Sequence, residues 1–342
     1  MALKDIAKEV GVSISTVSRV LNKESTSAAS EAMQQRIWAV AKEQGYLPNR
    51  MAQKLRNAEP DESGFLRQLY CLHACPPMET KDDPFYTKLM DYIEREALKH
   101  NYIMQYVFNA QEMDGGALPH YAVPSLYDGL IILGRFDAAL LESARRNFKK
   151  IIYVGLNRLS LSCDQIICNG YDVAQAVVRD FYGMGHRSIG YVGAMEARYQ
   201  GFLRGMEKLQ LKVNPHALIN DIPLSLNGGY RGMLRLIDKA PDTTAVFCAN
   251  DITAIGALRA CKIRGIRVPE DISLMGVNDI ENVQYTEPML STVRVPLEEM
   301  GRMAVTLLLN RVEGGHSCPV VVEFPFQLIH RESCLRINSK QL

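Results

Sequence analysis

The sequence predicts an α/β protein in which a small all-α module precedes a larger, doubly wound body. Residues 3 to 22 have the apolar spacing of two short helices joined by a tight turn. From residue 66 onward, short apolar runs alternate with amphipathic helical stretches, which is typical of doubly wound folds with mostly parallel sheets. A chain of 342 residues is too long for one compact core, so we expect a small module followed by a body of two lobes.

The first helical pair reads LKDIAKEVGVSISTVSRVLN and has the features of a helix-turn-helix. Gly11 supplies a turn in which positive φ costs little, and Ser13 sits where an N-cap is wanted. A second helix that starts at this cap would turn its apolar residues inward and present its polar face. The outward positions would be Ile14, Ser15, Thr16, Ser18 and Arg19. Such a helix suits the major groove of DNA, although an ordinary surface hairpin of helices has the same spacing.

A third helix is expected between a Ser30 cap and Gly45. The stretch that follows, GYLPNRMAQKLRN, allows two further helical turns at residues 49–56 before the acidic linker NAEPDES. A helix that short is marginal in water and needs DNA or a partner chain to hold it. We therefore place the first domain at residues 1–58 and the body at residues 59–342.

The body reads as a series of buried strands, namely LYCLHAC, IMQYVF, GLIIL, KIIYVGL, SIGYVG, AVFCAN and ISLMGV. Ligands of doubly wound folds bind beyond the carboxyl ends of the strands. The residues found there are Arg198, Asn250, Asp251, Asn278 and Asp279. Asp251 opens an apparent helix, so it could equally be an N-cap.

Charge is distributed unevenly between the two parts of the chain. The net charge is +1, but residues 1–58 hold nine Lys/Arg against five Asp/Glu, and the remainder holds 30 against 33. A basic excess on the small module fits contact with phosphates, whereas the near-neutral body does not look like a polyanion binder.

The sequence lacks the motifs of several function classes, which are therefore disfavoured. No secretion signal precedes the first helix and no apolar run reaches the ~18 residues that a membrane span needs, so we expect a cytoplasmic protein. The eight cysteines form no C-x-x-C pair and suit buried thiols. Cys71, His73 and Cys75 would share a strand face, but a fourth metal ligand is missing, so a packed core strand is the default. Phosphate-loop and nucleophile-elbow motifs are missing as well, so we expect neither a cofactor nor an enzyme.

Four stretches share an order and spacing that covers essentially the whole chain: VGVSISTVSRVLN, GYLPNRMAQKLR, GMGHRSIGYVG and AVFCANDITAIGALRACKIRGIRVPEDISLMGVNDI. Together they resemble the lactose and galactose repressor family of bacterial transcription regulators. Within that family, DDPFY, VNDI and PMLSTVR are most similar to the branch of the evolved β-galactosidase repressor. The resemblance implies a homodimer on near-palindromic operator DNA. It also implies a body of the periplasmic-binding-protein type, whose lobes are joined by chain crossings near residues 160, 291 and 320.

The resemblance implies how the DNA would be read. Residues 49–56 would fold as a hinge helix on the operator, with Asn49 in contact with DNA and Leu55 wedged into the minor groove. Such a wedge unstacks a base step and bends the duplex. The alternative is that Leu55 merely packs on the body. Ile14, Ser15 and Arg19 match base-reading positions, and an arginine can bond guanine bidentately.

One departure from the family pattern concerns the third helix. Met33 and Gln34 stand where relatives carry a Thr-Arg pair that faces phosphates. We therefore expect one phosphate contact fewer per subunit and a flatter salt dependence of DNA binding.

The resemblance also implies an effector site, because Arg198, Asn250 and Asn278 match the family's effector contacts. A guanidinium and a side-chain amide can each bond two neighbouring hydroxyls, so their chemistry suits a sugar. Phe85 and Tyr86 would cover the sugar ring, or alternatively pack between the lobes.

The sequence thus predicts a DNA-binding transcription regulator, expected to be a repressor, that is controlled by a sugar between its lobes, with a galactoside favoured. The alternative is a transport-type sugar-binding protein with the same body and no DNA role, which would need a secretion signal in place of the DNA-reading module. No leucine heptads follow Arg331, so we expect a dimer rather than a tetramer.

Overall fold

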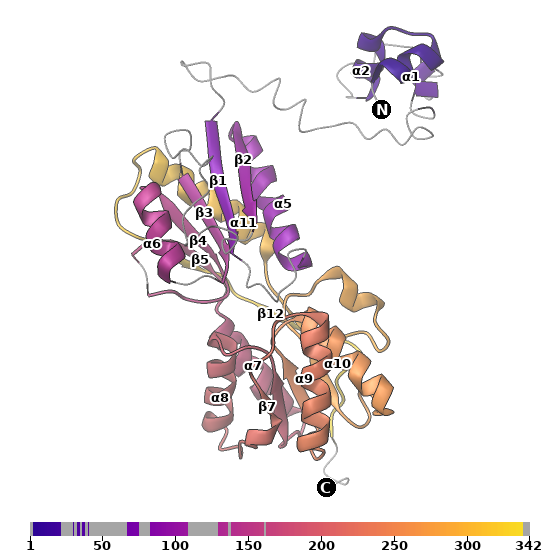
Figure 1. Ribbon diagram of the computed structural model, residues 1–342, viewed down its shortest axis with the longest axis vertical. Helices are drawn as coiled ribbons and strands as arrows, with labels where there is room; N and C mark the ends of the chain where they lie inside the picture. Colours follow the sequence, from indigo (N-terminus) through magenta and orange to yellow (C-terminus); the bar gives the residue numbers. More distant parts are fainter. Residues whose placement is uncertain are drawn as a thin grey trace. The chain divides into compact units, whose positions relative to one another are not determined.

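The computed structural model describes residues 3–21, 30, 33–34, 36–37, 40, 67–74, 83–108, 129–135, 138–160 and 162–337. The chain divides into two compact units, Met1–Leu66 and Arg67–Leu342, and each is described by itself (Figure 1). The predicted boundary after residue 58 and the predicted hinge helix at 49–56, with Asn49 and Leu55, lie outside the described residues.

The first unit contains the predicted helix-turn-helix. Helix α1 (Leu3–Val10) and helix α2 (Ile14–Leu21) are joined by a turn in which Gly11 has φ of +77°. The Ser13 hydroxyl accepts a hydrogen bond from the Thr16 amide at 3.1 Å, which confirms the predicted cap. The buried apolar residues of this unit are Ala7, Val10, Val17, Val20 and Ile37. Because Ile37 belongs to the third helical segment, that segment closes the core over the first two helices.

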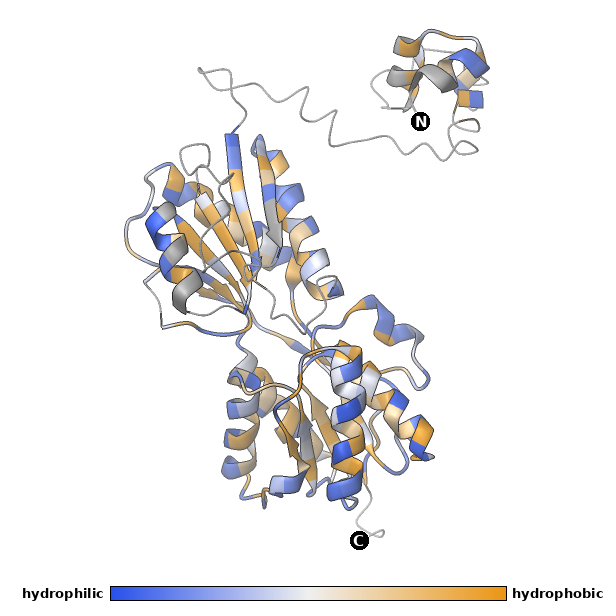
Figure 2. Ribbon diagram, viewed as in Figure 1, coloured by the Kyte–Doolittle hydropathy of each residue, from blue (hydrophilic) through white to orange (hydrophobic). Residues whose placement is uncertain are grey.

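The first lobe of the second unit is a six-stranded sheet of order β11-β5-β4-β3-β1-β2, in which every neighbouring pair is parallel. Its strands are β1 (Arg67–Ala74), β2 (Tyr102–Phe108), β3 (Gly129–Gly134), β4 (Ile151–Gly155), β5 (Asp164–Ile167) and β11 (Val321–Glu323). Helices α5 (Pro84–Lys99) and α11 (Leu297–Val312) cover one face, and α6 (Ala138–Asn147) covers the other. Both faces are therefore buried, which explains why the central strands are continuously apolar (Figure 2).

The second lobe is a four-stranded parallel sheet of order β7-β6-β8-β9. Its strands are β6 (Ile189–Val192), β7 (Leu218–Ile219), β8 (Ala245–Cys248) and β9 (Ser273–Met275). Its helices are α7 (Gly170–Gly183), α8 (Ala197–Lys208), α9 (Leu226–Lys239) and α10 (Asp251–Arg264), with the short turns η4 (Pro215–Ala217) and η5 (Glu281–Tyr285). Figure 1 shows the α7–α8 pair and the α9–α10 pair on opposite sides of this sheet, as a doubly wound fold requires.

Helices α9 and α10 approach each other closely at a glycine. A Cβ atom added at Gly229 would lie 2.1 Å from the backbone oxygen of Thr253. That separation is far inside van der Waals contact, so only glycine allows this helix spacing.

The chain passes between the lobes three times. The first passage lies between β5 and α7, later than the expected residue 160, because β5 adds a strand to the first sheet. The second passage runs from β10 (Thr292–Arg294) into α11, and the third runs from β11 to β12 (Gln327–Ile329). Strands β10 and β12 form a separate antiparallel pair at these passages.

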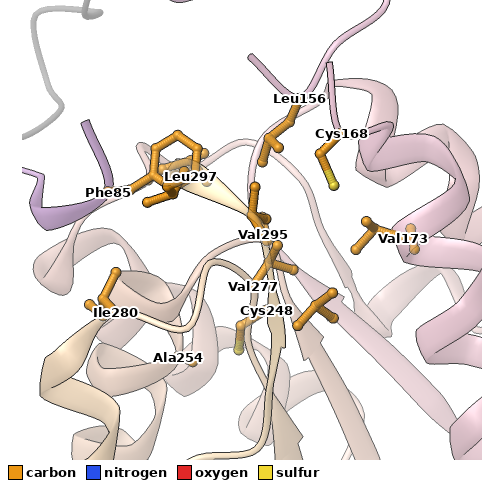
Figure 3. Packing of buried hydrophobic residues seen from close by; sticks show 14 of the residues in the cluster. Phe85, Leu156, Cys168, Val173, Cys248, Ala254, Val277, Ile280, Val295 and Leu297 are labelled. Atoms are coloured by element: carbon orange, nitrogen blue, oxygen red, sulfur yellow. The ribbon is translucent and has the colours of Figure 1, made fainter. Parts of the chain in front are cut away.

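The apolar core continues from one lobe into the other. Leu156 and Cys168 at the first passage, and Val295 and Leu297 at the second, belong to the same buried cluster as the residues of both sheets. Figure 3 shows these side chains together with Val277 of the second lobe. The junction is therefore packed rather than bridged by chain alone. Within the described part of the chain, helices fall short of the length and apolar character needed to cross a bilayer.

Candidate functional site

The predicted effector contacts converge on one cavity at the junction of the two lobes. Phe85 and Tyr86 lie in the first turn of α5, whereas Arg198, Asn250 and Asn278 follow strands β6, β8 and β9 of the second lobe. All of them line a cavity of about 20 Å³. The rest of the lining consists of Asp83, Arg135, Tyr153, Leu156, Asn157 and Leu224. A space of that size holds about one water molecule and is far too small for a sugar ring.

Arg198 is held by a buried ion pair. Its Nε donates to the Glu196 carboxylate, and its Nη1 donates to the backbone oxygen of Ala249 at 2.5 Å. The side chains of Arg198 and Glu196 are each 6% exposed. Burial alone would lower the pKa of Arg198, but the Glu196 carboxylate outweighs it and raises that pKa above its usual range. Arg198 is therefore a positively charged side chain in a fixed position, and two of its nitrogens, Nε and Nη1, already donate hydrogen bonds within the protein.

Glu196 also faces the opposite lobe. It stands at the N-cap of α8 but makes no cap hydrogen bond with its side chain. Its Oε2 lies 4.0 Å from Nη1 of Arg135, which follows β3 of the first lobe. A carboxylate of the second lobe thus lies between one arginine of its own lobe and one of the other lobe.

The N-cap of α10 is Asn250 and not Asp251, which the sequence offered as a possible cap. The Asn250 side-chain oxygen accepts from the Thr253 amide at 2.9 Å, so Asn250 is the N-cap of α10. Asp251 is completely buried, and its carboxylate accepts hydrogen bonds from the Thr292 hydroxyl at 2.5 Å and the Ile280 amide at 2.9 Å. Burial raises the pKa of Asp251 to about 8. Asp251 therefore braces β10 against α10 and does not line the cavity.

The cavity wall carries two acceptors without donors. Among the described residues, Oδ1 of Asn278 and Oδ1 of Asn157 are buried and accept no hydrogen bond. Asn278 has φ of 116° and Asp279 has φ of 52°, while the Asp279 carboxylate is fixed by Arg294 at 2.7 Å and Arg331 at 2.6 Å. Buried carbonyl oxygens of this kind are normally hydrogen-bonded, so they favour a ligand that brings its own O–H or N–H donors.

Both aromatic residues line the cavity and pack against the apolar core, and their contact with a sugar stays a prediction. Phe85 is 2% exposed and packs with Leu297 in the apolar core, as Figure 3 shows. The Tyr86 ring lies with its centroid 4.3 Å from that of His73. Cys71 is buried in the core, Cys75 lies outside the described residues, and no metal-binding cluster occurs within the described ranges.

The DNA-reading residues lie at the start of α2. Ile14 is 47% exposed, and the Thr16 hydroxyl lies 2.8 Å from that of Ser13, where it completes the cap. Ser15, Ser18 and Arg19 are in the same helix, although their side chains lie outside the described part of the structure. Met33 packs against the core of this unit rather than standing free for a phosphate contact.

Comparison with known proteins is consistent with both units. The family described as "Bacterial regulatory proteins, lacI family" matches residues 2–49, and the "Periplasmic binding protein-like domain" matches residues 178–334. The chain therefore has a lacI-family DNA-binding domain followed by a periplasmic-binding-protein-like body. It has the DNA-binding module of bacterial transcription regulators, and its curated relatives are transcriptional repressors rather than enzymes.

Curated relatives and solved structures match most or nearly all of this chain. The HTH-type transcriptional repressor MelR of Bacillus subtilis (strain 168) is 29% identical over 345 residues, 97% of each chain. The HTH-type transcriptional repressor PurR of Escherichia coli O139:H28 is also 29% identical, over 97% of this chain and 96% of its own. Among structures, the CelR–cellobiose complex has a TM-score of 0.71 at 24% identity and covers 97% of this chain and 99% of its own. A lacI-family regulator from Enterococcus faecium with bound ribose has a TM-score of 0.67 at 24% identity and covers 79% of this chain and 100% of its own.

Sequence reasoning missed several polar residues in the cavity region, among them Arg135, Asn157 and Glu196. Arg135 and Asn157 each follow a buried apolar run of the first lobe, so the rule that selected Asn250 would have found them had it been applied to both sheets. Glu196 also follows a strand, β6, and lies nearer to its end than Arg198 does, but its contact with an arginine of the other lobe is visible only in the structure.

Proposed function

We propose that this chain is a homodimeric repressor that reads a near-palindromic operator in the cytoplasm, where bacterial DNA lies. The support is the capped, exposed start of α2 together with the relatives, which are repressors. Two identical recognition helices can read only half-sites related by two-fold symmetry. The residues proposed to contact DNA are Ile14, Ser15, Thr16, Ser18, Arg19, Asn49 and Leu55.

We further propose that an uncharged sugar, with a galactoside favoured by the branch resemblance, binds in the lobe junction and controls operator affinity. The observation that carries this proposal is the pair of buried, unpaired amide oxygens beside Arg198 and Asn250 in one cavity. Sugar hydroxyls supply the missing donors and can accept from the arginine. Two solved relatives of the same fold are described with bound sugars, cellobiose and ribose.

Ligand entry must change the arrangement of the lobes, because the cavity of about 20 Å³ cannot admit a sugar as it stands. Separation of the lobes would alter the geometry of the three chain passages and hence of the dimer that presents the helix-turn-helix units. A sugar that binds one lobe arrangement better than the other shifts operator affinity by that difference, and one that binds both equally shifts nothing.

The effector is tested by calorimetry with galactose, lactose, melibiose, cellobiose and ribose, paired with operator binding in the presence and absence of each. Asn157→Ala removes one unpaired acceptor and should weaken sugar binding about five- to tenfold, the value of one hydrogen bond. Asn310→Ala, which removes an exposed amide near the end of α11 that does not line the cavity, is the matched control. If no sugar bound, or if a purine or a phosphorylated metabolite bound in place of sugars, the effector proposal would be wrong.

The DNA role is tested by footprinting and by two substitutions. Arg19→Ala should cost on the order of 1 to 3 kcal/mol of base discrimination per half-site. Leu55→Ala should weaken operator binding much more than binding to random DNA, because only the specific complex gains from the wedge. Equal losses on operator and random DNA would argue against both roles. Deletion of residues 1–58 should abolish retention on DNA; if sugar binding were the only activity of the full chain, the transport-type alternative would hold.

A further inference from the structure

Glu196 is held in a rigid setting behind the cavity wall. The loop that carries it follows β6, and the hydroxyl of the buried Tyr191 donates to the backbone oxygen of Ala194 at 2.9 Å. Ala194 also forms a bridge with Asp221 beyond the sheet edge. These contacts hold the backbone of the loop, and the carboxylate itself is held by its buried ion pair with Arg198.

The charges around the cavity depend on this one carboxylate. Arg135 and Arg198 line the cavity as cations, and Asp83 lines it as a carboxyl group whose pKa burial raises. Without Glu196, the wall would be positive and would attract a phosphate or carboxylate, for which arginines are the usual protein ligands. Glu196 is bonded to one guanidinium and lies 4.0 Å from the other, so it neutralises one of the two positive charges, and Asp83 is the second acidic group at the cavity.

We propose that Glu196 fixes the ligand class of the cleft, so that it accepts uncharged polyhydroxyl ligands and rejects phosphorylated or carboxylated ones. Glu196 acts through Arg198 and Arg135 and is a positioning residue rather than a direct contact, since it lies behind the residues that line the cavity. The inference rests on the proposed function, because it assumes that the cleft is the effector site.

The physical basis of this selectivity is the repulsion between an anionic ligand and the buried Glu196 carboxylate. An anionic group that approached either arginine would come close to the Glu196 carboxylate in surroundings where both are poorly hydrated. A neutral hydroxyl meets no such penalty and can bond the free edge of the guanidinium. The same carboxylate therefore leaves sugar binding possible and makes anion binding unfavourable.

The test uses the full-length protein and Glu196→Gln, which keeps the shape and an acceptor for Arg198 while it removes the charge. Calorimetry compares galactose and ribose with galactose 6-phosphate and ribose 5-phosphate. The wild-type protein should bind a neutral sugar at least tenfold more tightly than its phosphate. In Glu196→Gln, the ratio of the two affinities should shift at least tenfold toward the phosphate. Glu207→Gln, which removes an exposed carboxylate from the same helix, should leave the ratio unchanged.

A second variant keeps the proposal testable if Glu196→Gln folds poorly. Arg135→Gln removes the cation on the other lobe and should shift the ratio further away from phosphates. An unchanged ratio in folded Glu196→Gln, an unchanged ratio in Arg135→Gln, or a wild-type protein that preferred the phosphates would overturn the role of Glu196. A wild-type protein that bound none of the probes would instead overturn the proposed effector site itself, so the two failures are distinguishable.

Discussion

The Arg198–Glu196 pair predicts a large and asymmetric effect on stability. Both side chains are 6% exposed, so loss of one partner leaves the other charge buried. Arg198→Met keeps most of the apolar stem but removes the guanidinium, and Glu196 would then have only Arg135, 4.0 Å away. Breaking a buried pair in this way costs about 3 to 5 kcal/mol. We expect a loss of that size in the free energy of unfolding.

The double variant separates this cost from a simple loss of packing. In Arg198→Met with Glu196→Gln, no buried charge is left alone, and replacement of both partners by neutral groups is often close to neutral. We therefore expect the double variant to recover about half of the loss or more. Urea unfolding followed by circular dichroism at pH 7 gives the midpoints of all four proteins. A loss below about 1 kcal/mol in Arg198→Met, or a double variant whose loss equals the sum of the single losses, would refute the reasoning.

Three further predictions concern the packing of the body. Because burial raises the pKa of Asp251 to about 8, the unfolded chain loses this proton at lower pH than the folded chain, so stability falls as pH rises from about 4 to 8. Asp251→Asn should flatten that fall in urea titrations at pH 5 and pH 8, and an unchanged slope would contradict the assignment. Burial raises the pKa of Asp164, but its hydrogen bonds from Arg311 outweigh this and lower it. Asp164→Ala should therefore cost about 3 kcal/mol at pH 7 and progressively less as the pH falls below about 4, where the unfolded chain takes up this proton before the folded chain does; an equal loss at pH 7 and at pH 3 would exclude an ionic origin. Gly229→Ala should cost about 1 to 3 kcal/mol in thermal melts because it forces α9 away from α10, whereas Gly183→Ala, where a Cβ meets nothing within 4 Å, is the control that should melt near the wild type.

The sequence alone was sufficient to predict the features that depend on interactions between residues close together in the chain. The cap at Ser13, the glycine turn at Gly11 and the apolar faces of α1 and α2 depend on residues within a few positions of one another. The central strands of both lobes were likewise visible, because strands buried on both faces must be apolar throughout. Those strands also located Arg198, Asn250 and Asn278, since polar residues that follow parallel strands meet at one sheet edge.

Other features depend on segments far apart in the chain, and only the tertiary structure decided them. Strand β5 was not predicted, because its first residue is the polar Asp164, which is tolerated in the sheet only through its bonds to Arg311, 147 positions away. The N-cap of α10 passed to Asn250 because Asp251 is drawn into hydrogen bonds with β10. The position of Glu196 between Arg198 and Arg135 likewise depends on tertiary contacts, because Arg135 belongs to the other lobe. Apolar periodicity records which face of an element is buried, whereas the partner of a buried charge is set by distances that exist only after the lobes have folded together.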